Sequence, residues 1–375
     1  MSDTIRETAL RKQQRWIAAM RRQNGGASVL VAMSGGVDSS IAAYLLSSAG
    51  LQVIGIHFRL LPDDAPVSRG ACCHTASAAD VTAVCDIIGA SAQVWNLTEA
   101  FSKNVVEYFE NSYLQGETPN PCIECNRALK WGILWDRRAA LGVDFIATGH
   151  YARRIRLDSR YWFARGLDRS KDQAYALWCV PESRRAATLL PLGVFCKPEI
   201  RSIAADAGLP TAAVPESQDV CFLGATDYRE WLRARHPAVF VAGLIRTTSG
   251  ETVGRHNGVF GYTIGQRRGL GGGAVEPQYV VATDVATAEV IIGGREALLC
   301  KEVVVRRTVG EAVSERVLVQ IRYRDAGAPA RLYRGSEGRV RIRFETPVWA
   351  PAKGQSAAAF QGDRLVFGGI IDEIQ

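Results

Sequence analysis

Short apolar runs alternate with helical patterns over the first 230 residues. Buried strands are predicted at 29–32, 51–58, 94–97 and 143–148. Helices are predicted at 41–46, 76–88, 101–113 and 197–208, with further helices opening at Lys171 and running from Arg127 onwards. Strands that alternate with helices form βαβ units, whose right-handed crossovers place parallel strands side by side. The pattern therefore predicts an α/β domain built on a parallel sheet.

The pattern changes at about Trp231, where helical periodicity fades and glycines become frequent. Short alternating segments at 303–305, 317–323, 340–344, 356–360 and 365–371 are typical of a small β-barrel. A basic helix is predicted between Arg6 and Arg22, and we interpret its charged face as a solvated surface. We predict an N-terminal basic extension (1–26), a catalytic domain (27–230), a small central domain (231–298) and a C-terminal β-barrel (299–375).

A polar loop, Ser34-Gly35-Gly36-Val37-Asp38-Ser39, joins the first strand to the first helix of the α/β domain. Adjacent glycines let the backbone approach an anion, and the helix start supplies N–H donors and a positive dipole end. The loop lacks the Gly-Lys-Ser/Thr ending of the Walker loop. It resembles the PP-loop ATP pyrophosphatases, which cleave ATP between the α- and β-phosphates. The resemblance implies a Rossmann-like sheet of the adenine nucleotide alpha hydrolase type.

Two cysteines lie in polar surroundings that suit chemistry. Cys125 precedes the helix predicted from Arg127, with Asn126 as a possible cap, so the helix dipole and the nearby Lys130 favour its thiolate. Cys221 lies in a polar loop, although such a residue is by itself more often a small buried hydrophobe. A zinc site at 72–74 is not expected, because adjacent cysteines are poorly spaced for chelation.

Two strand ends add candidate ligand residues. Gly149 and His150 follow the strand at 143–148, and ligands of parallel sheets bind beyond the carboxyl ends of the strands. These residues are therefore expected on the same rim as the phosphate loop. Phe58 ends the strand at 51–58 and is either a packing partner for the adenine base or part of the core.

Composition indicates a cytoplasmic protein, and its basic charge is compatible with a polyanionic partner, although many basic proteins bind no nucleic acid. The chain has 375 residues, enough for two or three domains, and a formal net charge of +7. Its nine cysteines are an odd number in a long chain, which favours a reducing compartment over a disulfide framework. The sequence contains no apolar run of about eighteen residues and no signal-peptide pattern, so no membrane association is expected.

Six motifs, read together, are similar to those of the tRNA-specific 2-thiouridylases, bacterial enzymes that thiolate the wobble uridine of certain tRNAs. In chain order they are SGGVDSS, NPCIECN, ATGHYAR, KDQAYAL, ESQDVCF and GYTIGQRRGLG. The resemblance implies the cofactors ATP and Mg²⁺, tRNA recognised near its anticodon, and an upstream sulfur-relay or desulfurase protein as partners. It also implies an adenylated uridine C2 and a persulfide sulfur donor.

The resemblance also implies roles for individual residues. Cys125 would be the nucleophile and Cys221 the persulfide carrier. ATP would be bound by Ala32, Met33, Ser34, Gly35, Gly36, Val37, Asp38, Ser39, Phe58 and Gly149. The target base would lie against Asn120, Pro121 and Cys122. The tRNA would be contacted by His150, Lys171, Asp172, Gln173, Arg322, Tyr323 and Gln355.

Three other functions compete with this interpretation. Many relatives carry aspartate in place of Cys122. Unlike them, this chain offers three soft ligands, Cys122, Cys125 and Cys221, that could hold an iron–sulfur cluster. An amidating PP-loop synthetase would need neither paired thiols nor an arginine-rich β-domain. An RNA-binding protein with a vestigial nucleotide site would not require the complete loop at 34–39.

Overall fold

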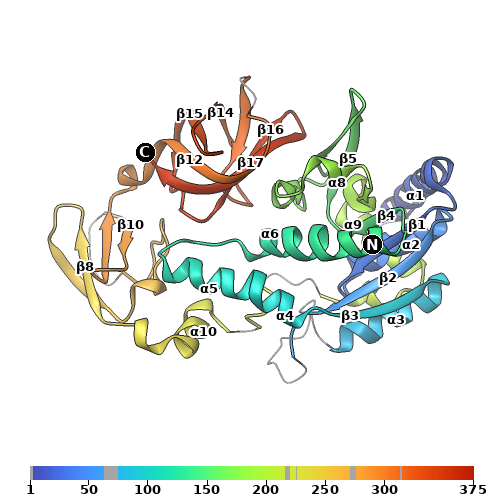
Figure 1. The fold of residues 1–375 in the computed structure, drawn as a ribbon, viewed down its shortest axis with the longest axis horizontal. Helices are drawn as coiled ribbons and strands as arrows, with labels where there is room; N and C mark the ends of the chain where they lie inside the picture. The colour runs from blue at the N-terminus through green and yellow to red at the C-terminus, as the bar shows by residue number, and fades with distance from the viewer. Residues whose placement is uncertain (1–2, 63–74, 216–219, 225, 271–275, 313–314) are drawn as a thin grey trace. The chain divides into compact units, whose positions relative to one another are not determined.

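The computed structural model describes residues 3–62, 75–215, 220–224, 226–270, 276–312 and 315–375 (Figure 1). These residues cluster into two compact units that are interleaved in sequence. The first comprises 1–105, 122–225 and 363–365, and the second 106–121, 226–362 and 366–375. The predicted division into four parts stays a prediction.

A five-stranded parallel sheet in the order β3-β2-β1-β4-β7 forms the centre of the first unit. Its strands are β1 (Ser28–Met33), β2 (Gln52–Arg59), β3 (Ser91–Asn96), β4 (Phe145–Thr148) and β7 (Thr188–Leu189). The predicted Rossmann-like sheet is confirmed, because β1 pairs in parallel with both β2 and β4. A hairpin of β5 (Ala152–Leu157) and β6 (Arg160–Arg165) follows β4 and was not predicted.

Helices cover both faces of this sheet. The helices of the first unit are α1 (Asp3–Asn24), α2 (Val37–Ser48), α3 (Thr75–Ile88), α4 (Thr98–Phe101), η1 (Ser102–Val106), α6 (Pro121–Cys125), η2 (Asn126–Leu134), α7 (Trp135–Ala140), η3 (Ala174–Leu177), α8 (Glu182–Arg185), η4 (Pro191–Val194), α9 (Lys197–Asp206) and η5 (Pro210–Ala213). Val29, Val31 and Met33 alternate along β1 into a core shared with α1, α2, α3 and α9, whereas Leu30 points to the opposite face. Helix α3 packs on β2 and β3 (Figure 1).

The second unit contains a four-stranded sheet and a closed barrel. Its helices are α5 (Glu107–Leu114), α10 (Tyr228–Arg235), η6 (Pro237–Val239), η7 (Val259–Gly261) and η8 (Arg295–Leu298). The sheet has the order β10-β11-β8-β9, with β8 (Gly243–Thr247), β9 (Thr252–His256), β10 (Tyr279–Asp284) and β11 (Glu289–Gly293). Val280, Val290 and Ile245 form its core with Phe260.

The predicted β-barrel is confirmed. Its strands are β12 (Leu299–Gly310), β13 (Val317–Gln320), β14 (Ala328–Arg334), β15 (Val340–Trp349), β16 (Ser356–Gln361) and β17 (Arg364–Ile374). They follow the order β12-β15-β14-β13-β16-β17, and β12 also pairs with β17, which closes the barrel. Val340, Ile342 and Phe344 alternate inward along β15, as expected for a strand with one buried face.

Two predicted helices differ from the observed ones. The helix predicted from Arg127 begins six residues earlier, at Pro121, whose lack of an N–H and fixed φ suit a first helical turn. The helix predicted to open at Lys171 is only the short 3-10 turn η3. Asp172 accepts the N–H groups of Gly166 and Ala174, so local side-chain bonds replace a helical turn.

Candidate nucleotide and thiol site

The loop at 34–39 lies at the carboxyl end of β1, as predicted. Gly35 has φ +78°, a left-handed conformation that glycine adopts without strain. The Ser39 hydroxyl accepts the Ser34 N–H at 3.1 Å and donates to the Gly36 carbonyl at 3.1 Å, and Ser40 donates to the same carbonyl at 3.0 Å. These bonds fold the loop back on the first turn of α2. Gly36 has no side chain that could cap α2, so the N–H groups of the first turn of α2 are suited to bind an anion.

Residues on either side of the loop hold it in place. Ala32 and Met33 end β1, and Val37 and Met33 are buried below the loop. Gly149 follows β4 and packs directly on the turn, where an added Cβ would lie 2.8 Å from the carbonyl carbon of Asp38 and the nitrogen of Ser39. Gly149 is thus on the rim with the loop, and any larger residue would push the loop outwards.

A lysine that the sequence analysis missed faces the loop. Lys197 begins α9 and places its Nζ 2.7 and 2.8 Å from the two carboxylate oxygens of Asp38. The Tyr151 hydroxyl donates to the same carboxylate at 2.7 Å. The loop has no lysine of its own, so Lys197 supplies the positive charge there. No local motif signals this contact, because the two residues are separated by 159 positions.

His150 and Phe58 are more enclosed than a ligand contact requires. His150 is buried, and its Nδ1 lies 2.7 Å from the Thr148 hydroxyl. Burial, with a smaller contribution from Lys130, lowers the pKa of His150 well below 6.5, so the ring is neutral at neutral pH. Phe58 is 7% exposed and stacks on Trp95 with ring centroids 6.3 Å apart. Its place in the core is evident, and its contact with adenine stays a prediction.

Cys125 ends α6 and is followed without a break by η2, a π-helix. The expectation that Cys125 starts a helix and that Asn126 caps it is therefore wrong. Asn126 is buried, donates to the Ala176 carbonyl at 3.1 Å and accepts from Lys130 at 3.0 Å. These bonds anchor the helix that carries Cys125. A π-helical segment in this position widens the helix locally and is often found at functional sites.

The three candidate thiols are more accessible than the buried Cys85, Cys179 and Cys300. Cys122 is exposed, whereas Cys125 and Cys221 are half-buried. Cys179 is buried, and burial raises its pKa to about 12, which keeps it a thiol. The positions at 72–74 and most of the ESQDVCF motif (216–219) lie outside the described residues.

A metal cluster on the three thiols receives no support from their arrangement. In the described part of the chain, which includes Cys122, Cys125 and Cys221, no three His, Cys, Asp or Glu side chains are grouped so as to hold a metal ion. Mg²⁺ has different requirements, because it is commonly held by one or two carboxylates and by the phosphates of the substrate. The partly exposed carboxylate of Asp38, within the loop, fits that role.

The predicted tRNA contacts of the first unit carry structural bonds. Asp172 pairs with Arg165 at 3.1 Å, and the Gln173 side chain accepts the backbone N–H of Tyr151 at 2.9 Å. Tyr151 in turn contacts Asp38, so these residues support the loop. Lys171 is half-buried. Contact of any of them with tRNA stays a prediction.

In the second unit, Gln355 lies beside the segment that leads to the target-base motif. Its side-chain amide donates to the Thr118 carbonyl at 3.0 Å, and the Thr118 N–H donates to the Lys353 carbonyl at 2.7 Å. Glu117 is held by Arg306 at 2.8 Å. These bonds tie the residues just before Asn120 and Pro121 to the barrel.

Arg322 and Tyr323 lie together in the barrel but differ in exposure. The Arg322 guanidinium donates to the carbonyls of Trp349 and Ala350 and lies over the Trp349 ring. Tyr323 is 43% exposed. Tyr323 thus lies at the surface, whereas Arg322 is partly engaged within its own domain.

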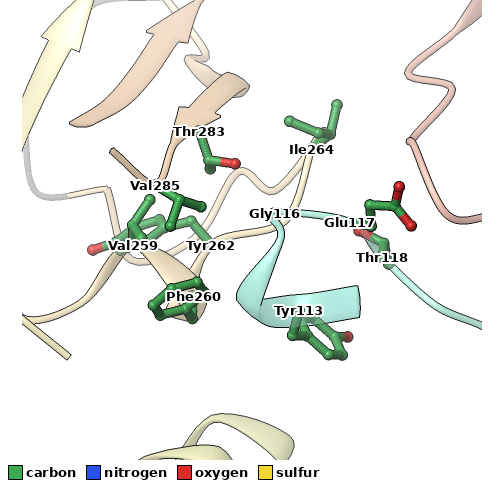
Figure 2. A pocket seen from close by; sticks show the side chains of 10 residues that line it. All are labelled: Tyr113, Gly116, Glu117, Thr118, Val259, Phe260, Tyr262, Ile264, Thr283 and Val285. Atoms are coloured by element: carbon green, nitrogen blue, oxygen red, sulfur yellow. The ribbon is translucent and has the colours of Figure 1, made fainter. Parts of the chain in front are cut away.

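A hollow in the second unit is distinct from the loop. Figure 2 shows its lining, which includes Tyr113, Gly116, Phe260 and Val285. Its enclosed volume of about 10 Å³ is room for roughly one water molecule. It is too small for a nucleotide, so the candidate site stays at the loop.

The parallel sheet and its Gly-Gly loop define the chain's class. A loop without a Walker lysine, at the carboxyl end of the central strand β1, marks a PP-loop nucleotide-binding protein of the α/β type. Three family models cover most of the chain: tRNA methyl transferase HUP domain (27–225), tRNA methyl transferase PRC-barrel domain (232–294) and Aminomethyltransferase beta-barrel domain (295–371).

Full-length relatives identify the family. A Moorella thermoacetica protein named tRNA-specific 2-thiouridylase MnmA is 44% identical over 92% of this chain and 99% of its own length. A Chloroflexus aggregans protein of the same name is 43% identical over 92% of this chain and 98% of its own. The chain belongs to the tRNA-specific 2-thiouridylase family. In the described part of the chain, no helix is both long enough and apolar enough to cross a membrane.

Proposed function

We propose that this protein uses ATP to replace the C2 oxygen of the wobble uridine of tRNA with sulfur. The observation that carries the proposal is the loop at 34–39, with Gly149 packed on it and Lys197 paired to Asp38, in a chain that belongs to the 2-thiouridylase family. The expected roles of the other ATP, target-base and tRNA residues follow from the same family.

The first step activates a poor leaving group. The uridine C2 oxygen attacks the α-phosphorus of ATP, the bond to the bridging oxygen breaks, and pyrophosphate leaves. The loop N–H groups and Lys197 are suited to stabilise the departing phosphates. Mg²⁺, held at Asp38 and the phosphates, would neutralise further charge.

The second step delivers sulfur from a persulfide on Cys221. Its terminal sulfur attacks C2, and AMP is lost from that carbon. The Cys125 thiolate then attacks the Cys221 sulfur, so the sulfur–sulfur bond breaks and its electron pair stays with the sulfur on C2. A disulfide between Cys125 and Cys221 remains and must be reduced by an external thiol. A sulfur-relay or desulfurase protein reloads Cys221.

Product analysis tests the first step. Incubation with tRNA, a persulfide source and ATP labelled in the adenine ring should yield AMP and pyrophosphate together with 2-thiouridine, separated by chromatography. The reason is that the loop lacks the lysine that directs Walker-type enzymes to the γ-phosphate. ADP and phosphate as the main products would contradict the proposal, and so would AMP formation without thiolated tRNA.

A further inference from the structure

The N-terminal helix α1 is an addition to the family domain. The HUP-domain match starts at residue 27, after the end of α1. The helix packs on α9 and α2, with Ala9 fully buried and Trp16, Ile17 and Met20 against the core of the first unit. The helix that we predicted to present a solvated basic face is therefore packed against the first unit along its other side.

One contact of α1 is partly buried and reaches the first turn of α9. Lys12 places its Nζ 3.0 and 2.8 Å from the two carboxylate oxygens of Glu199, whose side chain is 10% exposed. The same ammonium lies 5.5 Å from the ring centre of Phe195. Glu199 also accepts the backbone N–H of Cys196 at 2.6 Å, so it caps α9 while it pairs with Lys12.

The same turn of α9 carries Lys197, the lysine that pairs with Asp38 of the loop. The Lys197 N–H donates to Asp168 at 2.9 Å, which fixes its backbone, and its ammonium pairs with Asp38. The Lys197 side chain is 9% exposed and lies 5.7 Å from the Tyr151 ring centre. Because the backbone and the aliphatic part of Lys197 are both enclosed, a shift of the first turn of α9 would also shift the Lys197 ammonium.

We propose that α1 is a positioning element of the ATP site: through Lys12 and Glu199 it holds the first turn of α9, and thereby Lys197, in register with Asp38 of the loop. The inference rests on the proposed use of ATP. Lys12 pairs with Glu199 and lies over Phe195, not at the loop, so it is a positioning residue. The matching contact at the other end of α9, between Arg6 and Asp206, is exposed on both sides and lies away from the first turn.

This difference between the two ion pairs provides the experiment. In the full chain, Lys12→Met removes the charge but keeps the stem that covers Phe195, Lys12→Arg restores the charge, and Arg6→Ala is the matched control. We expect Lys12→Met to raise KM for ATP about 3- to 10-fold, with kcat at saturating ATP within about 2-fold of the parent. Lys12→Arg should recover most of the loss, and Arg6→Ala should leave KM unchanged.

A second measurement separates positioning from general stability. The thermal unfolding midpoint of each variant is recorded beside a direct titration with ATP and Mg²⁺. A lower midpoint for Lys12→Met with parental KM and ATP affinity would overturn the inference, as would an equal rise of KM in Arg6→Ala. These outcomes leave the proposed function intact if the parent forms AMP and thiolated tRNA; a parent that does neither refutes the function itself.

Discussion

At the scale of single residues, the thiols of this chain are separated by their surroundings. Cys122, Cys125 and Cys221 reach solvent in full or in part, whereas Cys300 is buried and donates to the carbonyls of Glu302 and Gln375. A thiol reacts as its thiolate, and burial without a positive partner disfavours that form. Only the accessible thiols are therefore candidates for sulfur transfer.

Serine variants test the assignment of the two reactive thiols. Cys221→Ser should abolish thiolation and leave AMP formation intact, because the sulfur carrier is lost while the loop is untouched. Cys125→Ser should leave the sulfur bonded to Cys221, as a persulfide without tRNA and as a Cys221–sulfur–tRNA adduct when tRNA and ATP are present, detected by mass spectrometry. Cys300→Ser is the control and should keep thiolation, since a hydroxyl carries one hydrogen, as the thiol does, and can donate it to the same carbonyls. Full thiolation by Cys221→Ser would refute the persulfide route.

Cys122→Ser distinguishes this route from a cluster. With a persulfide, the variant should lose little to moderate activity and the parent should contain no stoichiometric iron. If the three thiols held a cluster, the variant would lose iron and activity together. Thiolation and iron content measured on protein purified without oxygen decide between the two.

The buried His150 predicts a pH dependence of stability. Its pKa is held well below 6.5 in the folded protein, so below about pH 6.5 the unfolded chain binds a proton that the folded chain does not. Stability is therefore lost as the pH falls, with at most about 1.4 kcal/mol per pH unit from this group. Urea unfolding of His150→Gln between pH 7 and 5 should show a shallower decline than the parent. Equal slopes would mean that the ring takes up a proton when folded.

At the scale of elements, the loop at 261–270 presents charge on a fixed frame. Gly265, with φ +83°, donates its N–H to the Val280 carbonyl, and Val280 donates to the Gln266 carbonyl. Arg267 and Arg268 follow, both exposed. The loop is thus anchored on β10 while its guanidinium groups face solvent, which is the arrangement that phosphate contacts need.

Salt dependence of tRNA binding tests this loop. If about five phosphates are contacted, log K should fall with log[salt] at a slope of roughly −3.5 to −4.5. Arg267→Ala with Arg268→Ala should weaken binding and make the slope shallower, as measured by filter binding. Arg255→Ala, which removes an exposed arginine of β9 in the same sheet, is the control and should leave the slope nearly unchanged. Unchanged affinity in the double variant would make the loop an ordinary solvated surface.

At the scale of the whole molecule, the chain crosses between its two units more than once. Residues 106–121 cluster with the second unit, although the segments on either side belong to the first. The NPCIECN motif starts at the end of that excursion, with Thr118 held by Lys353 and Gln355. A net charge of +7 on such a chain suits a polyanion as large as tRNA.

Local patterns were sufficient for the parallel sheet, the loop and the barrel. Period-two alternation and apolar runs indicate which faces of a strand are buried. The glycines at 35 and 36 indicate a backbone that turns tightly. The start of the helix at Pro121 was missed because the two prolines, Pro119 and Pro121, suggested a non-helical approach. The short turn at 174–177 was missed because Asp172 and Gln173 bond to backbone groups, and no sequence pattern indicates these bonds.

The sequence alone determined the class of fold, the place of the phosphate loop and the family, because these depend on short-range patterns and on motifs in a set order. Only the tertiary structure decided that Lys197 faces Asp38, that His150 is enclosed and that Lys12 reaches Glu199. Each of these contacts joins residues on different elements, and the packing of whole helices on the sheet sets their distance. Such contacts leave no periodicity in the chain, so no local pattern predicts them.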